Sequence, residues 1–376
     1  MWTGLMAGLF LLSIYSYFIY PVLLLILRLF RRRGIARAPI EPRVSLIITA
    51  YNEEHKIEGK LRNSREVEYP SAQLEIIVAS DSSTDRTDAI VSATQGVKLV
   101  RADVRKGKEY AQKLAVQQAT GEILVFTDTG TMLDRQAIRL LVRNFADAGV
   151  GAVSSTDKLV NENNEVVGEG LYVKYEMLLR RLEHQVNSLV GLSGSFFAAR
   201  SEVCRDWADD LQSDFNTVLN SIKKGYRAVA DDDVIGYYKN IKKGQSEFHR
   251  KVRTMVRGIT VFFRTLDLLN PFRYGLFAWQ LFSHKLMRWL VPFFLLALLA
   301  VSAAAAAAGD TNGRVFLALQ AASYAAVIAA GVWPALQKIP PIKIAYFFIE
   351  ANLAAAFAWA KYLRGERIKL WEPSKR

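Results

Sequence analysis

Asp128 stands where a carboxylate can meet a bound ligand, because it follows the apolar run 123–126 after a single threonine. A continuous apolar run of this length predicts a buried strand of a parallel sheet. Open α/β sheets bind ligands in the crevice beyond the carboxyl ends of their strands. A carboxylate there suits Mg²⁺ or Mn²⁺, since both ions prefer oxygen ligands and bridge phosphates. The alternative is that Asp128 only caps a helix that follows the strand.

Three other polar segments also follow apolar runs. They are residues 50–54 after the run 44–49, residues 80–87 after the run 74–79, and residues 105–108 after the run 97–100. The second segment contains Asp81 and Asp85, and the third contains Lys106 and Lys108. Parallel strands end at one edge of a sheet, so we expect these segments to converge there with Asp128. Helix capping is the alternative for Asp81 and the simpler role for Asp85. The alternative for both lysines is an ordinary solvated position on the protein surface.

The elements that would position these side chains alternate between strand and helix. Helices are expected at 56–65, after residue 87, and from 108 to about 120. Such alternation predicts an α/β fold with a doubly wound parallel sheet. Farther along the chain we expect a strand at 151–155, a mixed helical stretch at 156–190, a glycine-rich turn and strand at 191–198, a helix at 209–224 and a strand at 226–230.

Long apolar segments lie at both ends of the chain. Residues 4–30 are long enough to cross a bilayer, and the arginines at 31–33 place their end in the cytoplasm by the positive-inside rule. Three further apolar segments lie at 288–308, 315–335 and 342–361. The last of these carries Lys343 and Glu350, and a basic tail follows it. We therefore expect the last segment not to cross the membrane fully.

The chain is thus expected to have four parts. They are an N-terminal transmembrane helix (1–34), a cytoplasmic α/β domain (35–246), interfacial amphipathic helices (247–287), and C-terminal transmembrane helices with a basic cytoplasmic tail (288–376).

Charge and cysteine content exclude several classes of protein. The net charge is +13, but the basic residues crowd beside the apolar segments, as at 28–33 and 361–376. That placement fits an anionic membrane surface better than a duplex, so we expect membrane lipids and no nucleic acid as partners. The single cysteine, Cys204, excludes an intrachain disulfide, and no Cys/His cluster has the spacing of a zinc site.

The order and spacing of the polar motifs resemble the nucleotide-sugar half of the family 2 glycosyltransferases. The resemblance covers about residues 43–264 and implies a Rossmann-like GT-A domain, the fold of nucleotide-diphospho-sugar transferases. The motifs that carry it are residues 49–54, Asp81 with Asp85, Lys106-Gly107-Lys108, and Asp128.

Nucleotide-binding residues follow from this resemblance. In the family, the loops after the first and second strands hold the nucleotide base and ribose, which implies these roles for Ala50, Tyr51, Glu53 and Asp81. An aspartate can accept a hydrogen bond from uracil N3–H or from ribose hydroxyls. The lysine motif lies near the diphosphate in the family, which implies that role for Lys106 or Lys108, each acting as a point charge.

The metal motif departs from the family pattern. The family has Asp-X-Asp or Asp-Ala-Asn, whereas this chain has Asp128-Thr129-Gly130 and lacks the third-position ligand. The resemblance implies that Asp128 binds Mg²⁺ or Mn²⁺ with diphosphate oxygens and water, since Mg²⁺ tolerates few protein ligands. The alternatives are that Thr131 or another residue helps, or that activity is reduced or lost.

Asp214 matches the position of the family's catalytic base. Inverting transfer needs a carboxylate that takes the proton from the acceptor hydroxyl as this hydroxyl attacks the anomeric carbon. The segment Ser213-Asp214-Phe215 precedes Gly225-Tyr226-Arg227 by the family spacing, which implies that Asp214 is the base. The alternative is a carboxylate that merely stabilises the N-terminus of a helix. Gly194 resembles the family's acceptor-site glycine.

A cationic segment replaces the family's Gln-X-X-Arg-Trp motif. Residues 247–253 lack the glutamine and the tryptophan, which weakens the case for a long polymer channel. Arg250 and Arg253 keep the cationic function, and the resemblance implies that they stabilise the departing nucleoside diphosphate. Binding of anionic lipid headgroups is the alternative for both.

The resemblance implies an inverting glycosyltransferase in the inner (plasma) membrane, with several spans and its catalytic domain in the cytoplasm. It would move a sugar from a nucleotide-diphosphate sugar, expected to be a UDP-sugar, to a polysaccharide or polyprenyl-linked acceptor. The alternative is a catalytically degenerate GT-A scaffold or regulator of polysaccharide synthesis. Gly130 and the missing tryptophan favour the scaffold, whereas the retained Asp128 and Asp214 oppose it.

Overall fold

The computed structural model of the protein describes residues 1–160, 171–239, 245–368 and 370. Its chain divides into two compact units. The helical unit comprises Met1–Leu23, Lys243–Ile259 and Trp279–Arg367, and the sheet unit comprises Leu24–Lys242, Thr260–Ala278 and Ile368–Arg376. Part of the helical stretch expected at 156–190, residues 161–170, and the end of the basic tail, residues 369 and 371–376, lie outside the described residues.

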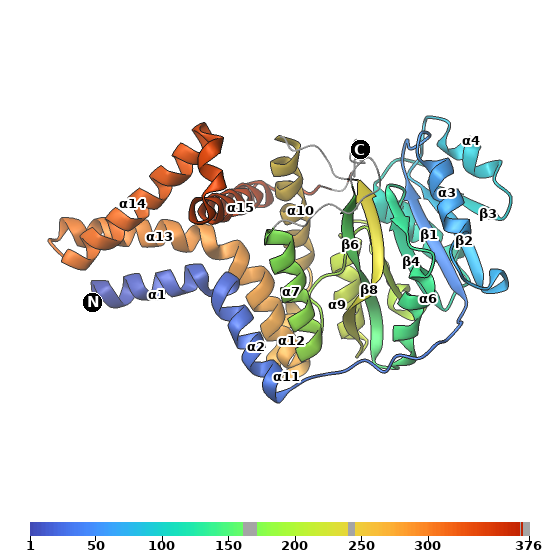
Figure 1. Ribbon diagram of the computed structural model, residues 1–376, viewed down its shortest axis with the longest axis horizontal. Coiled ribbons are helices and arrows are strands. Elements are labelled where there is room, and N and C mark those ends of the chain that lie inside the picture. Colours follow the sequence, from blue (N-terminus) through green and yellow to red (C-terminus); the bar gives the residue numbers. More distant parts are fainter. Residues whose placement is uncertain (161–170, 240–244, 369, 371–376) are drawn as a thin grey trace. The chain divides into compact units, whose positions relative to one another are not determined.

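One sheet organises the sheet unit, and its described strands run in the order β3-β2-β1-β4-β7-β6-β8-β5. Figure 1 labels β1, β2, β3, β4, β6 and β8 of this sheet. The strands are β1 (Val44–Ala50), β2 (Leu74–Ser80), β3 (Val97–Arg101), β4 (Ile123–Asp128), β5 (Thr131–Leu133), β6 (Val150–Val160), β7 (Phe196–Arg200) and β8 (Arg227–Lys239). β1 pairs in parallel with β2 and β4, and β3 pairs in parallel with β2. Every residue of β1 is buried, as a central strand covered on both faces requires.

The other half of the sheet is mixed, so the expectation of a purely parallel sheet is wrong there. β7 is antiparallel to both β4 and β6, and β5 is antiparallel to β8. Among the described strands of this half, β6 and β8 are the pair that runs in parallel. A strand that is buried on both faces has the same apolar sequence whichever way it runs, so its direction could not be predicted from its residues.

Two strands in this half are longer than expected. β8 was expected to end at residue 230, but it continues through the three aspartates at 231–233. The strand continues because Asp231, which is buried, accepts hydrogen bonds from Arg143 at 3.1 Å and from Asn144 at 2.7 Å. β6 continues to Val160 beside β8, so helix is not found at 156–160, where it was expected.

Helices pack around the sheet, and most of them lie where the sequence predicted a helix. The α-helices of the sheet unit include α3 (Ile57–Arg65), α4 (Thr87–Ser92), α5 (Lys108–Gln118), α6 (Ala137–Val142), α7 (Leu171–Val186), α8 (Ser201–Cys204), α9 (Ser213–Lys223) and α11 (Pro271–Tyr274). Aromatic stacking links β4 to the segment before α9, because Phe126 stacks on Trp207 at 4.6 Å and on Phe197 at 4.9 Å. These contacts fix the approach of α9 to the end of β4.

The helical unit contains the long apolar helices. The helices that form or enter it are α1 (Trp2–Ile14), α2 (Tyr20–Phe30), α10 (Gln245–Phe263), α12 (Leu276–Leu281), α13 (Met287–Ala307), α14 (Thr311–Val332) and α15 (Pro340–Leu363). Among the described residues, four helical runs are long and apolar enough to cross a membrane, and they are Trp2–Phe30, Leu276–Ala307, Thr311–Val332 and Pro340–Leu363. α1 packs against α13 around Met6, Leu298 and Ala305.

The expected membrane segments are all helical in this structure. The last one, expected at 342–361, forms α15, and whether it crosses a membrane stays a prediction. The last part of the segment expected to lie in the interface (247–287) is continuous with α13 from Leu276 onward, through a π-helical turn at Phe282–Leu286.

Close packing between β1 and the residue that leads into β4 predicts the effect of Gly121→Ala. A Cβ atom on Gly121 would lie 2.5 Å from the backbone nitrogen of Ser45, so β1 or β4 would have to shift. Overpacking of this kind typically costs about 1–3 kcal/mol. We expect the substitution to lower the free energy of unfolding by about that amount, measured as a lower melting temperature of the full-length protein.

Gly59→Ala in α3 is the matched control, because its Cβ would meet nothing within 4 Å and alanine favours helices. It should leave the melting temperature unchanged or raise it. Equal melting temperatures for Gly121→Ala and the wild type would contradict the close approach of the two strands.

Candidate functional site

The carboxyl ends of β1, β2 and β4 bring the predicted ligand-binding residues to one edge of the sheet. Thr49 of β1 is the register partner of Asp128 in β4, and Ala50 is that of Ser80 in β2. The backbone N–H of Asp81 donates to the carbonyl of Ala50 at 3.0 Å. Ala50, Asp81 and Asp128 therefore lie at the same edge, as the sequence predicted.

Asp128 is followed by a turn and a strand, and it does not cap a helix. Residues 129 and 130 form the turn into β5, whose residues the sequence analysis did not predict as a strand. The Asp128 carboxylate accepts a hydrogen bond from the Lys108 ammonium at 2.5 Å, and its side chain is 25% exposed. Asp128 is thus already paired with a cation, yet solvent still reaches it.

Lys108 links Asp128 to the turn before β7. Its ammonium also donates to the carbonyl of Gly194 at 2.9 Å, and its side chain is only 9% exposed. The residue before it, Gly107, has φ of +108°, a backbone conformation that favours glycine, and it precedes the first residue of α5. The glycine of the Lys-Gly-Lys motif therefore allows the chain to turn so that Lys108 reaches the strand end.

Asp81 holds the loop that carries both lysines. Its carboxylate accepts the backbone N–H groups of Lys106 at 3.0 Å and of Gly107 at 3.0 and 3.1 Å. Asp81 is fully buried, and this burial raises the pKa of its carboxyl although the two N–H groups oppose the shift. The contacts seen for Asp81 are thus structural, and its role in binding a nucleotide stays a prediction.

Asp214 lies in the first turn of α9, and its carboxylate lies beside Gly194, in the turn before β7. A Cβ atom on Gly194 would lie 3.0 Å from the Asp214 carboxylate, so only a residue without a side chain fits easily between them. The carboxylate accepts hydrogen bonds from the backbone N–H of Phe215 at 2.9 Å and from the Gln212 amide at 3.1 Å. Through Gly194 and Lys108, the structure connects the predicted base with the predicted metal ligand.

The loop after β1 is held against the loops after β2 and β3. The Arg105 guanidinium lies 3.9 Å from the centre of the Tyr51 ring, which is a cation–π contact. Glu53 is largely buried and pairs with Lys56 at 2.9 Å. Asp85 accepts the backbone N–H groups of Glu54 and Thr87, and this structural role agrees with the capping interpretation.

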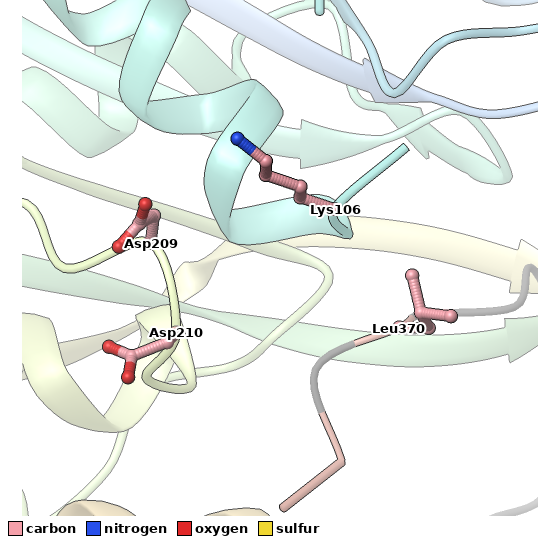
Figure 2. A pocket seen from close by; sticks show the side chains of 4 residues that line it. All are labelled: Lys106, Asp209, Asp210 and Leu370. Atoms are coloured by element: carbon pink, nitrogen blue, oxygen red, sulfur yellow. The ribbon is translucent and has the colours of Figure 1, made fainter. Parts of the chain in front are cut away.

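A cavity of about 360 Å³ opens beside the lysine motif. Its lining comprises Lys106, Asp209, Asp210 and Leu370 (Figure 2). Asp210 pairs with Arg264 at 2.7 Å, and Asp209 approaches Lys113 at 3.6 Å. Lys106 itself lies over the ring of Tyr110, with its nitrogen 4.4 Å from the ring centre. Of the two lysines of the motif, Lys106 is therefore the one that lines this cavity.

Lys60 is a cation of the site that the sequence analysis missed. It is fully buried in α3 and donates to the hydroxyl of Thr127 at 3.1 Å and to the carbonyl of Thr131. Burial lowers the pKa of Lys60 to about 7, and the negative charge of Asp128 opposes this shift. No sequence signal identified it, because a lysine in an amphipathic helix is normally solvated.

Asp157 is a second missed residue, and it shapes the turn that contains Gly194. Its carboxylate accepts the hydroxyl groups of Ser193 at 2.5 Å, Ser195 at 2.8 Å and Ser155 at 3.1 Å. Burial raises the pKa of this carboxyl. Asp157 lies in β6, where the sequence analysis expected helix, so its proximity to the Ser-Gly-Ser turn was not foreseen.

The protein donors for a divalent ion are few. Among the described residues, no group of three or more His, Cys, Asp or Glu side chains could hold a metal ion. Asp128 is a hard oxygen donor at the strand edge, and it fits Mg²⁺ or Mn²⁺ if a diphosphate and water supply the other ligands. Arg250 and Arg253 lie on α10, in the part of that helix that belongs to the helical unit, so their predicted contact with a diphosphate stays a prediction.

Comparison with known proteins finds similarity over part of the chain. Residues 45–207 match the family model described as Glycosyl transferase family 2. The chain is 24% identical over 178 residues to poly-beta-1,6-N-acetyl-D-glucosamine synthase of Staphylococcus epidermidis, which covers 45% of this chain and 42% of that protein. It is 31% identical over 128 residues to a probable glycosyltransferase of Bacillus subtilis, YdaM, covering 32% of this chain and 30% of the relative. The chain thus spans less than half the length of these curated relatives.

A solved structure shares the fold over nearly the whole chain. The mannosyltransferase PcManGT from Pyrobaculum calidifontis, in complex with GDP-Man and Mn²⁺, superposes with a TM-score of 0.75 and 24% sequence identity. The match covers 97% of this chain and 100% of that chain. The predicted Rossmann-like GT-A fold is confirmed by this likeness.

The Lys108–Asp128 pair predicts how a metal ion binds to the free protein. The ammonium occupies the carboxylate that an ion would need, so Lys108→Met should strengthen Mn²⁺ binding by several-fold in the absence of nucleotide. Free Mn²⁺ can be measured by its electron paramagnetic resonance signal. Asp128→Ala should abolish the binding.

Lys106→Met is the matched control, because Lys106 belongs to the same loop but lies over Tyr110. It should leave Mn²⁺ affinity near that of the wild type. Unchanged or weaker binding in Lys108→Met would mean that the two cations do not compete for Asp128.

Proposed function

We propose that this chain, which carries a glycosyl transferase family 2 domain over residues 45–207, is an enzyme that moves a sugar from a nucleotide-diphosphate sugar to an acceptor hydroxyl. One observation carries the proposal. Lys108 bridges Asp128 and the carbonyl of Gly194, and Gly194 in turn abuts the Asp214 carboxylate. A phosphate-binding side and a potential base thus face each other at the carboxyl edge of the sheet.

The donor would be held by the loops at this edge. We assign the nucleotide to Ala50, Tyr51, Glu53 and Asp81, because these residues follow β1 and β2. The UDP-sugar assignment rests on the family resemblance, whereas PcManGT was solved with GDP-Man. Guanosine and uridine donors therefore both belong in a test.

Cations near the diphosphate would stabilise the leaving group. Lys106 faces the cavity, and Lys108 needs only to exchange one anionic partner for another to contact a phosphate oxygen. Arg250 and Arg253 are proposed to act on the same diphosphate from α10. Mg²⁺ or Mn²⁺ at Asp128 would add positive charge that neutralises the developing diphosphate. The Mn²⁺ in PcManGT supports a divalent ion in this fold.

Asp214 is proposed to be the base of an inverting transfer. The acceptor oxygen attacks the anomeric carbon, its proton passes to the Asp214 carboxylate, and the bond from the anomeric carbon to the diphosphate oxygen breaks. The electron pair of that bond leaves with the nucleoside diphosphate. The hydrogen bonds from Phe215 and Gln212 hold the carboxylate in one orientation beside Gly194, where an acceptor can approach.

The acceptor is proposed to be a growing polysaccharide or a polyprenyl-linked saccharide at the inner membrane. The similarity to a poly-beta-1,6-N-acetyl-D-glucosamine synthase supports a glycan acceptor, and the four apolar helical runs in the described part support a membrane location. The catalytic domain would face the cytoplasm, because the arginines at 31–33 follow the first of these helices.

A non-catalytic scaffold is the second candidate function. Two observations favour it, namely the missing third-position carboxylate at Gly130 and the occupation of Asp128 by Lys108. In such a protein the GT-A domain would bind a nucleotide or glycan without turnover.

Release of nucleoside diphosphate by the full-length protein tests the proposal. We would offer UDP-, GDP- and dTDP-sugars with Mg²⁺ or Mn²⁺ and a membrane lipid extract as acceptor. One donor should support release, and Asp214→Asn should lower the rate by at least ~100-fold because the acceptor proton loses its base. Asp128→Ala should abolish release. Asp214→Asn should leave the melting temperature nearly unchanged, whereas Asp128→Ala deprives the largely buried Lys108 ammonium of its carboxylate and should lower the melting temperature.

Asp206→Asn is the matched control, since Asp206 is 76% exposed and pairs only peripherally with Lys224 in the structure. It should keep the wild-type rate. If no donor supports release but a nucleotide raises the melting temperature, the scaffold is the better account. Full activity in Asp214→Asn would remove Asp214 from the role of base.

A further inference from the structure

A second cavity, of about 220 Å³, lies in the sheet unit and is rich in cations. Its lining includes Arg33, Arg227 and Arg273 together with Tyr226, Tyr274 and Phe277. Among the described residues that line it, none is acidic. Such a lining suits an anion that also has an apolar portion.

This cavity is remote from the candidate catalytic edge in the topology of the sheet. Gly149 and Arg227, which line it, stand immediately before β6 and at the first residue of β8. β6 and β8 run in the same direction as β4, because β7 is antiparallel to both β4 and β6. They therefore begin at the edge opposite to the one where β4 ends in Asp128. The cavity is a separate site.

Arg227 lines the cavity, and one of its guanidinium nitrogens has no hydrogen-bond partner among the described residues. It is only 5% exposed, and its guanidinium pairs with Asp147 at 3.1 Å and donates to the carbonyl of Gly34. Its Nη1 atom is buried and has no hydrogen-bond partner among the described residues. A buried donor without a partner is costly, and a bound anion close to this guanidinium would offset that cost.

Positive charge around Arg227 exceeds the negative charge that faces it. Arg33 donates to the side-chain oxygen of Asn187 at 3.1 Å, which leaves its charge unneutralised by that contact. Burial and the charges of Arg227 and Arg31 lower the pKa of Arg33, while Asp147 opposes the shift. Arg273 is exposed at the end of α11. Of the three guanidinium groups, that of Arg227 pairs with Asp147, and the described residues show no ion pair for Arg33 or Arg273.

Chain connectivity puts the cavity at the ends of two candidate membrane helices. Arg33 follows closely on Phe30, where the run Trp2–Phe30 ends, and Phe277 is next to Leu276, where the run Leu276–Ala307 begins. If these helices cross a membrane, both of their ends near the cavity lie at its surface. Leu29, Phe30 and Phe272 are 82%, 84% and 100% exposed, as side chains that enter the membrane interface would be.

We propose that this cavity binds the phosphate of an anionic phospholipid headgroup and so anchors the sheet unit to the membrane surface. Guanidinium groups form bidentate, charge-assisted hydrogen bonds with phosphate. A free phosphate ion shares this chemistry, but the exposed apolar side chains beside the arginines match the acyl portion of a lipid. The site does not depend on the proposed sugar transfer.

Binding of a short-chain lipid to the detergent-purified full-length protein tests this site. Dioctanoyl phosphatidylglycerol should bind saturably, as counted by native mass spectrometry. Arg33→Gln combined with Arg273→Gln should weaken this binding roughly 30-fold, because each arginine near an anionic lipid contributes about 1 kcal/mol. Arg62→Gln with Arg65→Gln on α3 removes the same charge from exposed positions outside the cavity and should leave affinity unchanged.

Three results would overturn the assignment. They are equal affinity of the two double variants, equal affinity for dioctanoyl phosphatidylcholine, and phosphate-only binding in which inorganic phosphate occupies the cavity and the lipid does not compete. If Arg33→Gln prevents folding, Arg273→Gln alone decides, since Arg273 is exposed on a short helix. That single variant should weaken lipid binding roughly 5-fold.

Discussion

The ammonium group of Lys108 joins three segments that are far apart in the sequence. It bonds Asp128 at the end of β4 and the carbonyl of Gly194 before β7, while its own backbone begins α5. Its side chain is 9% exposed, and a charge pair with so little access to water is stronger than one on the surface. Asp81 supports this arrangement, because its carboxylate accepts hydrogen bonds from the backbone N–H groups of Lys106 and Gly107, which immediately precede Lys108. The geometry of the candidate site therefore depends on one cation and its loop.

Gly194 allows Lys108 and Asp214 to lie on either side of one turn. Gly194 presents its carbonyl to Lys108 on one side and leaves room for the Asp214 carboxylate on the other. Asp157 fixes the turn through the hydroxyl groups of Ser193 and Ser195. The proposed base and the proposed phosphate-binding lysine are thus held by a rigid, hydrogen-bonded turn, as proton transfer with defined geometry requires.

The sequence predicted the parallel half of the sheet well because its four strands alternate with helices and end in polar residues. Those strand ends brought Ala50, Asp81 and Asp128 together as expected. Strand direction in the other half was not readable, since β7 is as apolar as a parallel strand would be. Lys60 was missed for a related reason, because only tertiary packing reveals that this helix position lies fully buried beside β4.

Charge balance around Asp128 bears on the missing second carboxylate of the metal motif. The pair of Asp128 and Lys108 is already neutral, whereas an Asp-X-Asp motif without such a lysine carries two negative charges that attract an ion by themselves. A divalent ion at Asp128 would add positive charge to a place where Lys108, and Lys60 when protonated, already supply it. A nucleotide diphosphate brings the negative charge that removes this repulsion, and it offers Lys108 another anionic partner. The electrostatics therefore favour joint binding of ion and donor over binding of the ion first, so the substitution at Gly130 need not abolish metal use.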